Sequence, residues 1–170
     1  MTSGTPYRDR AGVHSIDHFA LEVPELNAAQ AFFDAFGLRV TTGSAGLDLY
    51  ASGSDHRWGR ILPGKRKRLA YLAFNCYVGD FESIGEQVKA AGAAAADPHP
   101  AGSAQGLWCR DPDGNLLQIQ PGPKTSPDAK PPSVTLQAGA GARAILGRSG
   151  YERVRPRRMS HVLLFSNDVP

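Results

Sequence analysis

The side chains best suited to metal chemistry in this sequence are its five histidines, because neutral imidazole is the commonest metal ligand in proteins. They stand at positions His14, His18, His56, His99 and His161. His14 and His18 share a face of a predicted strand, but about 13 Å of strand separates them, so they cannot bind one ion. Turn-forming residues surround His56 and His99, and we expect both of these, like His14, to be solvated.

An acidic run, Asp-Pro-Asp-Gly-Asn at residues 111–115, is a further group of candidate ligands. Asp at the first position, Pro at the second and Gly at the fourth favour a type I turn, and the apolar runs on both sides predict a hairpin. A calcium-binding loop needs Gly at its sixth position and Glu at its twelfth, whereas here Gly is fourth and Gly122 is twelfth. We therefore exclude a calcium site.

Composition excludes several other classes of function. The net charge of +3 comes partly from basic clusters at residues 65–68 and 153–158, but both precede predicted strands and no aromatic residues alternate with them, so we expect no nucleic acid partner. Cys76 and Cys109 lack a metal-like spacing and are expected to be buried structural thiols. No apolar run approaches the length of a membrane span, and the polar residues 1–12, expected to be flexible, contain no signal peptide. These features predict a cytoplasmic globular protein.

Internal repetition organises the chain into modules. Residues 13–64 contain an alternating strand, an amphipathic helix that ends at Gly37, and three short strands. Residues 67–122 repeat the order, with a strand at 69–78, a helix near 80–91, and strands near 93–96, 106–110 and 116–120. Superposing the first strands of the repeats places His18, Tyr71 and His161 at one equivalent position.

The end of the sequence predicts the start of a further module. Residues 123–157 are rich in Pro, Gly and Ala and are expected to be a linker. Residues 158–170 then repeat the histidine and apolar run of the first strand, and we expect them to be the truncated start of a second domain. An unpaired strand at residues 160–165 would pair with another element or another subunit, so a homo-oligomer formed by strand exchange of 158–169 is a further expectation.

The strand–helix–three-strand order, and above all the Trp108-containing strand that leads into the Asp-Pro-Asp-Gly-Asn hairpin, resemble the vicinal oxygen chelate superfamily. This superfamily includes glyoxalases, bleomycin resistance proteins and type I extradiol dioxygenases. The resemblance covers residues 13–122, with 161–169 opening a further module. It implies an α+β fold in which two βαβββ modules form one cupped mixed sheet, followed by a long linker and the first strand of a further module.

The resemblance also implies where metal ligands would lie, namely at His18, Tyr71 and Gln118. Tyr and Gln supply neither the charge nor the imidazole that a divalent metal prefers, so the first domain is expected to be metal-free. Of the two readings of His18, a core histidine with satisfied hydrogen bonds is preferred to a degenerate ligand or small-molecule contact.

A silent first domain is typical of two-domain extradiol dioxygenases, in which an Fe(II) site lies in the second domain. The resemblance then implies that His161 is an iron ligand of the parent protein, whose remaining ligands lie beyond Pro170. The parent would cleave a catechol-type aromatic, and the isolated fragment would be inactive. The alternative is a metal-free module of the glyoxalase and bleomycin-resistance type that binds an aromatic small molecule between Phe74, Tyr71 and Trp108.

Overall fold

The structure is a computed structural model that describes residues 10–125 and 155–164. Most of the predicted amino-terminal tail and linker, and residues 165–170, therefore lie outside the described residues. The first module consists of the elements β1 (Val13–Val23), α1 (Leu26–Phe36), β2 (Arg39–Thr42), β3 (Leu47–Tyr50) and β4 (Arg57–Pro63). The second consists of β5 (Arg68–Cys76), the short 3-10 helix η1 (Val78–Asp80), α2 (Phe81–Ala90), β6 (Ala94–Ala95), β7 (Leu107–Arg110) and β8 (Leu116–Pro121).

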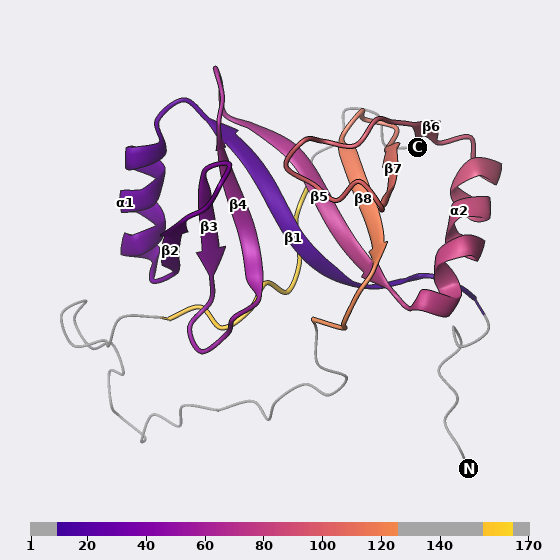
Figure 1. Ribbon diagram of the computed structural model, residues 1–170, viewed down its shortest axis with the longest axis horizontal. Coiled ribbons are helices and arrows are strands. Elements are labelled where there is room, and N and C mark those ends of the chain that lie inside the picture. The colour runs from indigo at the N-terminus through magenta and orange to yellow at the C-terminus, as the bar shows by residue number, and fades with distance from the viewer. Residues whose placement is uncertain (1–9, 126–154, 165–170) are drawn as a thin grey trace, which may run out of the picture.

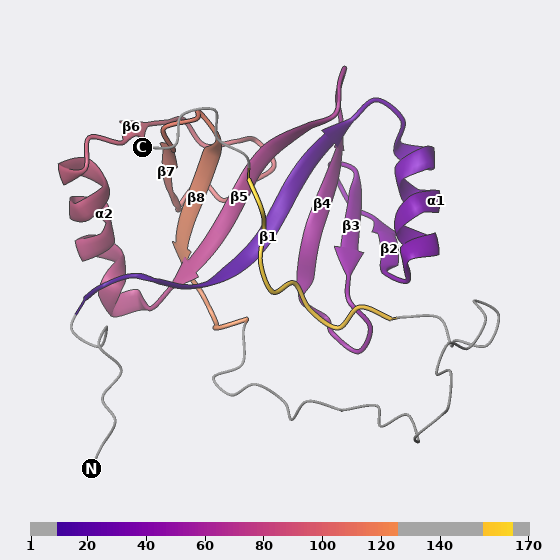
Figure 2. The ribbon, with the colours of Figure 1, turned by 180° about the vertical axis from the view of Figure 1, so that it is seen from behind.

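The strands form one eight-stranded mixed sheet with the order β2-β3-β4-β1-β5-β8-β7-β6. Within each module the last strand lies parallel to the first, β4 beside β1 and β8 beside β5, and the antiparallel pair β1–β5 joins the modules at the centre. The two helices lie at opposite ends of this sheet (Figures 1 and 2). The predicted α+β fold of two βαβββ modules is therefore confirmed.

Apolar side chains of alternate strand positions hold each helix against the sheet. Under α1, Leu49 and Ile61 pack with the half-buried Phe33. In the equivalent cluster at α2, Ile84 of the helix packs against Cys76 and Ile119 of the sheet. The opposite face of the sheet carries a third cluster, which includes Ala20, Leu62, Ala70, Tyr71, Ala73 and Trp108. The sheet thus has a helix-covered face and a second face on which the predicted ligand positions lie.

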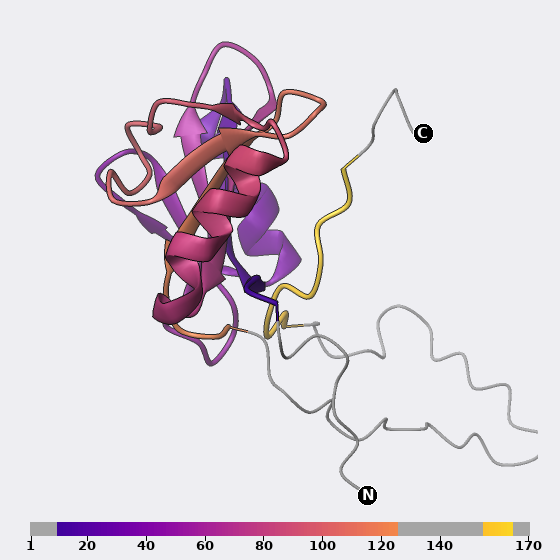
Figure 3. The ribbon, with the colours of Figure 1, turned by 90° about the vertical axis from the view of Figure 1, so that its right-hand side faces the viewer.

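The predicted opening strand of a further module is not formed in the described residues. Residues 155–164 carry no strand, and their contact with the domain includes a hydrogen bond from the Ser52 amide to the Pro156 carbonyl oxygen at 2.7 Å. Figure 3 shows this segment, in gold, running along the outside of the domain. An apolar run alone does not make a strand, because strand backbone also needs a partner for its amides and carbonyls. Strand exchange with another subunit stays a prediction.

Candidate functional site

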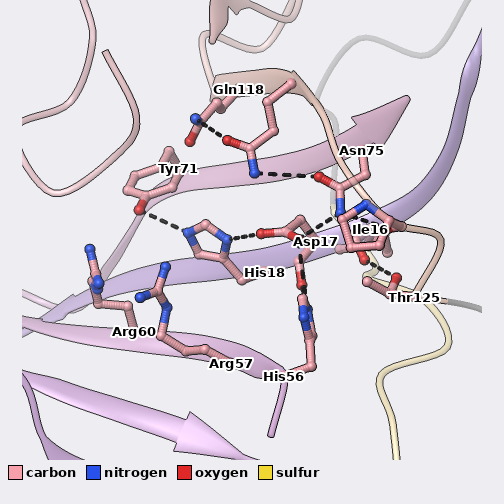
Figure 4. A network of polar contacts seen from close by, with 12 residues as sticks. Ile16, Asp17, His18, His56, Arg57, Arg60, Tyr71, Asn75, Gln118 and Thr125 are labelled. Atoms are coloured by element: carbon pink, nitrogen blue, oxygen red, sulfur yellow. Dashed lines mark hydrogen bonds and ion pairs between the residues drawn. The ribbon is translucent and has the colours of Figure 1, made fainter. Parts of the chain in front are cut away.

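The three predicted ligand positions of the first domain lie on neighbouring strands at the centre of the sheet. His18 on β1 pairs with Ala73 on β5, which in turn pairs with Gln118 on β8. Tyr71 lies two residues before Ala73, and its hydroxyl is 2.9 Å from His18 Nε2 (Figure 4). All three side chains are buried, and Tyr71 and Gln118 are fully so. The sheet therefore brings these positions into one polar cluster.

Asp17 also belongs to this cluster. Neighbouring residues of a regular strand point to opposite faces of the sheet, so Asp17 would not be expected on the same face as His18. The register between β1 and β5 shifts between Ile16 and His18, so Asp17 is the extra residue of a β-bulge. Its carboxylate lies 2.6 Å from His18 Nδ1 and accepts a hydrogen bond from Asn75 Nδ2 at 2.7 Å. His56, which we expected to be solvated, is only partly exposed, and its Nε2 lies 2.7 Å from the Asp17 carbonyl oxygen.

The count of available protons fixes the direction of the central hydrogen bonds. The Tyr71 hydroxyl has one proton and two acceptors within reach, His18 Nε2 at 2.9 Å and the Ala101 carbonyl oxygen at 3.1 Å. The Ala101 carbonyl already accepts a hydrogen bond from Arg60 Nη1, so it does not depend on that proton. A neutral His18 that donates from Nδ1 to Asp17 and accepts at Nε2 from Tyr71 satisfies every partner.

The electrostatics favour this neutral form of the histidine. Burial lowers the pKa of His18, and it does so against the opposing effect of the Asp17 carboxylate. Burial alone would raise the pKa of Asp17, but its interactions with His18, followed by the hydrogen bond from Asn75, outweigh burial and hold that pKa below its usual value. Burial also raises the pKa of Tyr71, so its phenol stays protonated. Asp17, His18 and Tyr71 therefore form a carboxylate–imidazole–phenol chain. In this chain one proton lies on His18 Nδ1 and another on the Tyr71 hydroxyl.

This donor set does not fit a divalent metal ion. His18 Nε2, the nitrogen that faces Tyr71, is already an acceptor for a phenol whose raised pKa opposes its conversion to a charged ligand. Gln118 is a neutral amide whose Nε2 donates to Gln120 Oε1 at 2.8 Å. Gln118 Oε1 is buried without a hydrogen-bond partner, but one neutral carbonyl cannot offset the desolvation of a dication. Across the described residues, no three His, Cys, Asp or Glu side chains come together as potential ligands.

A loop closes the space that the predicted pocket would occupy. Trp108 packs edge-on against Tyr71, with ring centroids 5.2 Å apart, and its Nε1 donates to the Ser103 carbonyl oxygen at 2.8 Å. Gly102 lies so close to the Trp108 ring that a Cβ atom there would overlap it. The loop at residues 96–106 therefore packs directly on the aromatic residues that were predicted to line a pocket.

The prediction for Phe74 is wrong, because its side chain belongs to the other face of the sheet. It packs with Cys76, Ile84 and Ile119 under α2, whereas Tyr71 and Trp108 belong to the cluster on the opposite face. Strand alternation separates these faces, since residues 71 and 74 differ by an odd number of positions. Phe74 is a core residue that holds the helix.

His161 lies apart from this network. It is exposed, with its Nδ1 2.9 Å from the Ser160 hydroxyl oxygen. Its predicted role as an iron ligand stays a prediction. Sequence reasoning missed Asp17, Asn75 and His56, and only Asp17 had a visible signal, as a carboxylate next to the candidate histidine.

Comparison with curated proteins finds a metapyrocatechase that is similar to this chain. It is 50% identical over 163 residues to metapyrocatechase 2 from Cupriavidus necator, an alignment that covers 95% of this chain and 50% of that protein. The chain thus spans about half the length of the curated relative it matches. No model of a known protein family matches it. In the described residues, no helix is both long and apolar enough to cross a membrane.

Solved structures share the fold. A Mn(II)-bound glyoxalase from Novosphingobium aromaticivorans superposes with a TM-score of 0.55 at 24% identity, over 63% of this chain and 38% of that one. A catechol 2,3-dioxygenase does so with a TM-score of 0.56 at 23% identity, over 67% and 41%. An extradiol ring-cleaving dioxygenase from B. fuscum gives 0.55 at 19% identity, over 68% and 34%. The chain therefore has the fold of the vicinal oxygen chelate superfamily of glyoxalases and extradiol dioxygenases, as its sequence motifs indicated.

Proposed function

We propose that this chain is part of an iron(II)-dependent extradiol dioxygenase that cleaves a catechol-type aromatic, and that residues 13–122 are its non-catalytic domain. The observation that carries the proposal is the 50% identity to a metapyrocatechase across 95% of the chain. Identity at this level over nearly the whole chain goes beyond a shared fold. The alignment covers half of that relative, which fits a catalytic site in the other half.

The geometry of the first domain supports a structural role for its histidine. The two nitrogens of His18 are occupied by Asp17 and Tyr71, so no lone pair is left for iron without breaking a buried hydrogen bond. The catalytic site would then lie in a second cupped sheet, in another domain of the complete enzyme. His161 is our candidate for its first ligand, because it repeats the position of His18 on an exposed segment.

Iron needs more than this one imidazole. A facial triad of two histidines and one carboxylate leaves positions open for catecholate and dioxygen, which is the chemistry that iron would supply. We propose that the second histidine and the carboxylate follow in the coding sequence. A second Asp-Pro-Asp-Gly-like hairpin just before that carboxylate would match the internal repeat.

The test compares two histidines in the product of the complete coding sequence. Iron content and oxygen uptake with catechol are measured for His161→Ala and for the matched variant His18→Ala. We expect His161→Ala to lower activity and iron content by more than about a hundredfold, because it removes a direct ligand. His18→Ala should retain both in the fraction that folds. Loss of iron in His18→Ala with retention in His161→Ala, or a stop codon after Pro170, would contradict the proposal.

The alternative function, a metal-free aromatic-binding module, has less support. Its predicted walls Tyr71 and Trp108 are buried beneath the loop at residues 96–106, and Phe74 faces α2. An aromatic ligand would have to displace that loop. Catechol binding by the 170-residue chain alone, abolished by Trp108→Ala, would favour this alternative.

A further inference from the structure

Two arginines of β4 share one carboxylate on the face of the sheet that carries His18. Arg60 Nε lies 3.1 Å from Asp48 Oδ1, and Arg57 Nε lies 3.6 Å from the same oxygen. The register between β3 and β4 shifts so that Leu49 pairs with Gly59 but Tyr50 with Arg57, which makes Trp58 the extra residue of a second bulge. This bulge brings Arg57 to the same face as Arg60, although the two are an odd number of positions apart.

The charges of this group do not balance. Arg57 and Arg60 carry two positive charges, and Asp48 is the single carboxylate within ion-pair distance of them among the described residues. The three side chains are 33%, 16% and 14% exposed respectively, so the surplus charge is only partly hydrated. Arg57 Nε is buried and has no hydrogen-bond partner. A partly buried guanidinium without a full set of acceptors is costly, which favours an added anion.

Arg39 continues the row of cationic side chains beside Arg57, although its own charge is paired with a carboxylate. Arg39, Tyr50 and Arg57 are successive register partners across β2, β3 and β4, so they form a row on one face. Arg39 lies over the Tyr50 ring, 4.2 Å from its centroid. Arg39 also contacts Asp55, at 3.4 Å. In Figure 4 the side chains of Arg57 and Arg60 rise from β4 toward His18 and Tyr71.

We propose that Arg57 and Arg60 form a binding site for a compact oxyanion, the carboxylate or phosphate group of a small ligand. The planar guanidinium fork matches the two oxygens of such a group, and partial burial strengthens the interaction compared with one at an open surface. Arg60 is fixed by hydrogen bonds to the Ala101 carbonyl and Asp48, whereas Arg57, the more exposed of the two, makes no hydrogen bond within the described residues and is freer to contact an added anion. The site needs no metal and goes beyond the function proposed above.

The experiment titrates the 170-residue chain with inorganic phosphate and, separately, with benzoate, at low and constant ionic strength. Isothermal titration calorimetry measures the dissociation constant and the stoichiometry. We expect saturable binding of about one anion per chain, weakened about tenfold or more in Arg57→Gln. The matched control is Arg66→Gln, an exposed arginine of a basic turn that should bind like the unmodified chain. Circular dichroism checks that each variant is folded.

A third variant gives an effect of opposite sign. Asp48→Asn removes the internal carboxylate that competes with the anion, so binding should tighten several-fold instead of weakening. Saturation by benzoate alone would identify a carboxylate ligand, and saturation by phosphate alone a phosphorylated one. The proposal is overturned if neither anion binds saturably at up to about 10 mM, where a weak but specific oxyanion site would still fill. Equal binding in Arg57→Gln and Arg66→Gln, or weaker binding in Asp48→Asn, would also overturn it.

Discussion

Removing a single hydroxyl group tests the buried network around His18. In Tyr71→Phe the aromatic packing against Trp108 and the His18 ring remains, because the ring is unchanged. The variant loses the hydrogen bond from the hydroxyl to His18 Nε2, which contributes about 1 kcal/mol. It also leaves that nitrogen buried without a donor, which costs about 1–2 kcal/mol more. The Ala101 carbonyl keeps its bond from Arg60. We expect a total loss of about 2–3 kcal/mol in the free energy of unfolding.

Urea unfolding at pH 7.5 measures this loss, and the urea dependence of the unfolding free energy should stay constant. Tyr77→Phe is the matched control: Tyr77 is 56% exposed, so its variant should fall within about 0.5 kcal/mol of the unmodified chain. A double-mutant cycle of Tyr71→Phe with His18→Ala should give a coupling energy of about 1–2 kcal/mol, because each change removes the same hydrogen bond. Equal effects of Tyr71→Phe and Tyr77→Phe, or zero coupling with His18, would refute the proton assignment.

Three other predictions follow from the same geometry. Because burial lowers the pKa of His18, the unfolded chain takes up a proton below about pH 6.5 that the folded chain does not, so stability should fall by about 1.4 kcal/mol per pH unit there. Acid unfolding curves should show a shallower slope in His18→Gln, and an unchanged slope would contradict the neutral histidine. Gly102→Ala should destabilise by about 1–3 kcal/mol through overlap with Trp108, whereas Gly85→Ala, with open space in α2, should stabilise by about 0.5–1 kcal/mol; thermal unfolding separates the two. The double variant Tyr71→His/Gln118→Glu should gain about one equivalent of Zn²⁺ and a metal-dependent rise in Tm, neither of which the unmodified chain should show on dialysis against the metal.

Regular periodicity and local turn chemistry made much of the fold predictable. Apolar residues at spacings of three and four predicted α1, and Gly37 ends it with a φ of 99° as the left-handed cap requires. The hairpin at residues 111–115 forms as expected, with the Asn115 amide donating to Asp111 Oδ1 at 2.8 Å and Gly114 at a φ of 83°. These features depend on neighbours in sequence, so sequence alone carries the information.

Two features of the site, the contact of Asp17 with His18 and the placement of Arg57 with Arg60, depend on β-bulges that interrupt the regular strand alternation. Strict strand alternation would place Asp17 and His18 on opposite faces of the sheet, and Arg57 and Arg60 likewise on opposite faces. A bulge in β1 and another in β4 bring each pair to one face instead. Neither bulge is marked by a glycine at the extra residue, so the sequence gives no local signal for it. The contact between Asp17 and His18 and the pairing of Arg57 with Arg60 on one face therefore became apparent only from the structure.

The predicted ligand positions of the first domain can hold buried polar side chains without a metal ion if these side chains form hydrogen bonds with one another. A metal would provide a charge to which His18 and its partners could all donate electron pairs. Without it, the buried acceptor atoms of His18 and Asp17 need protons from their neighbours. The Tyr71 hydroxyl donates a hydrogen bond to His18 Nε2, and His18 Nδ1 in turn donates one to the Asp17 carboxylate. Asn75 donates a second hydrogen bond that stabilises the charge of this carboxylate. Tyr71 thus donates a hydrogen bond at a position where the resemblance implies a metal ligand, and the hydrogen bonds of the buried His18 side chain are satisfied.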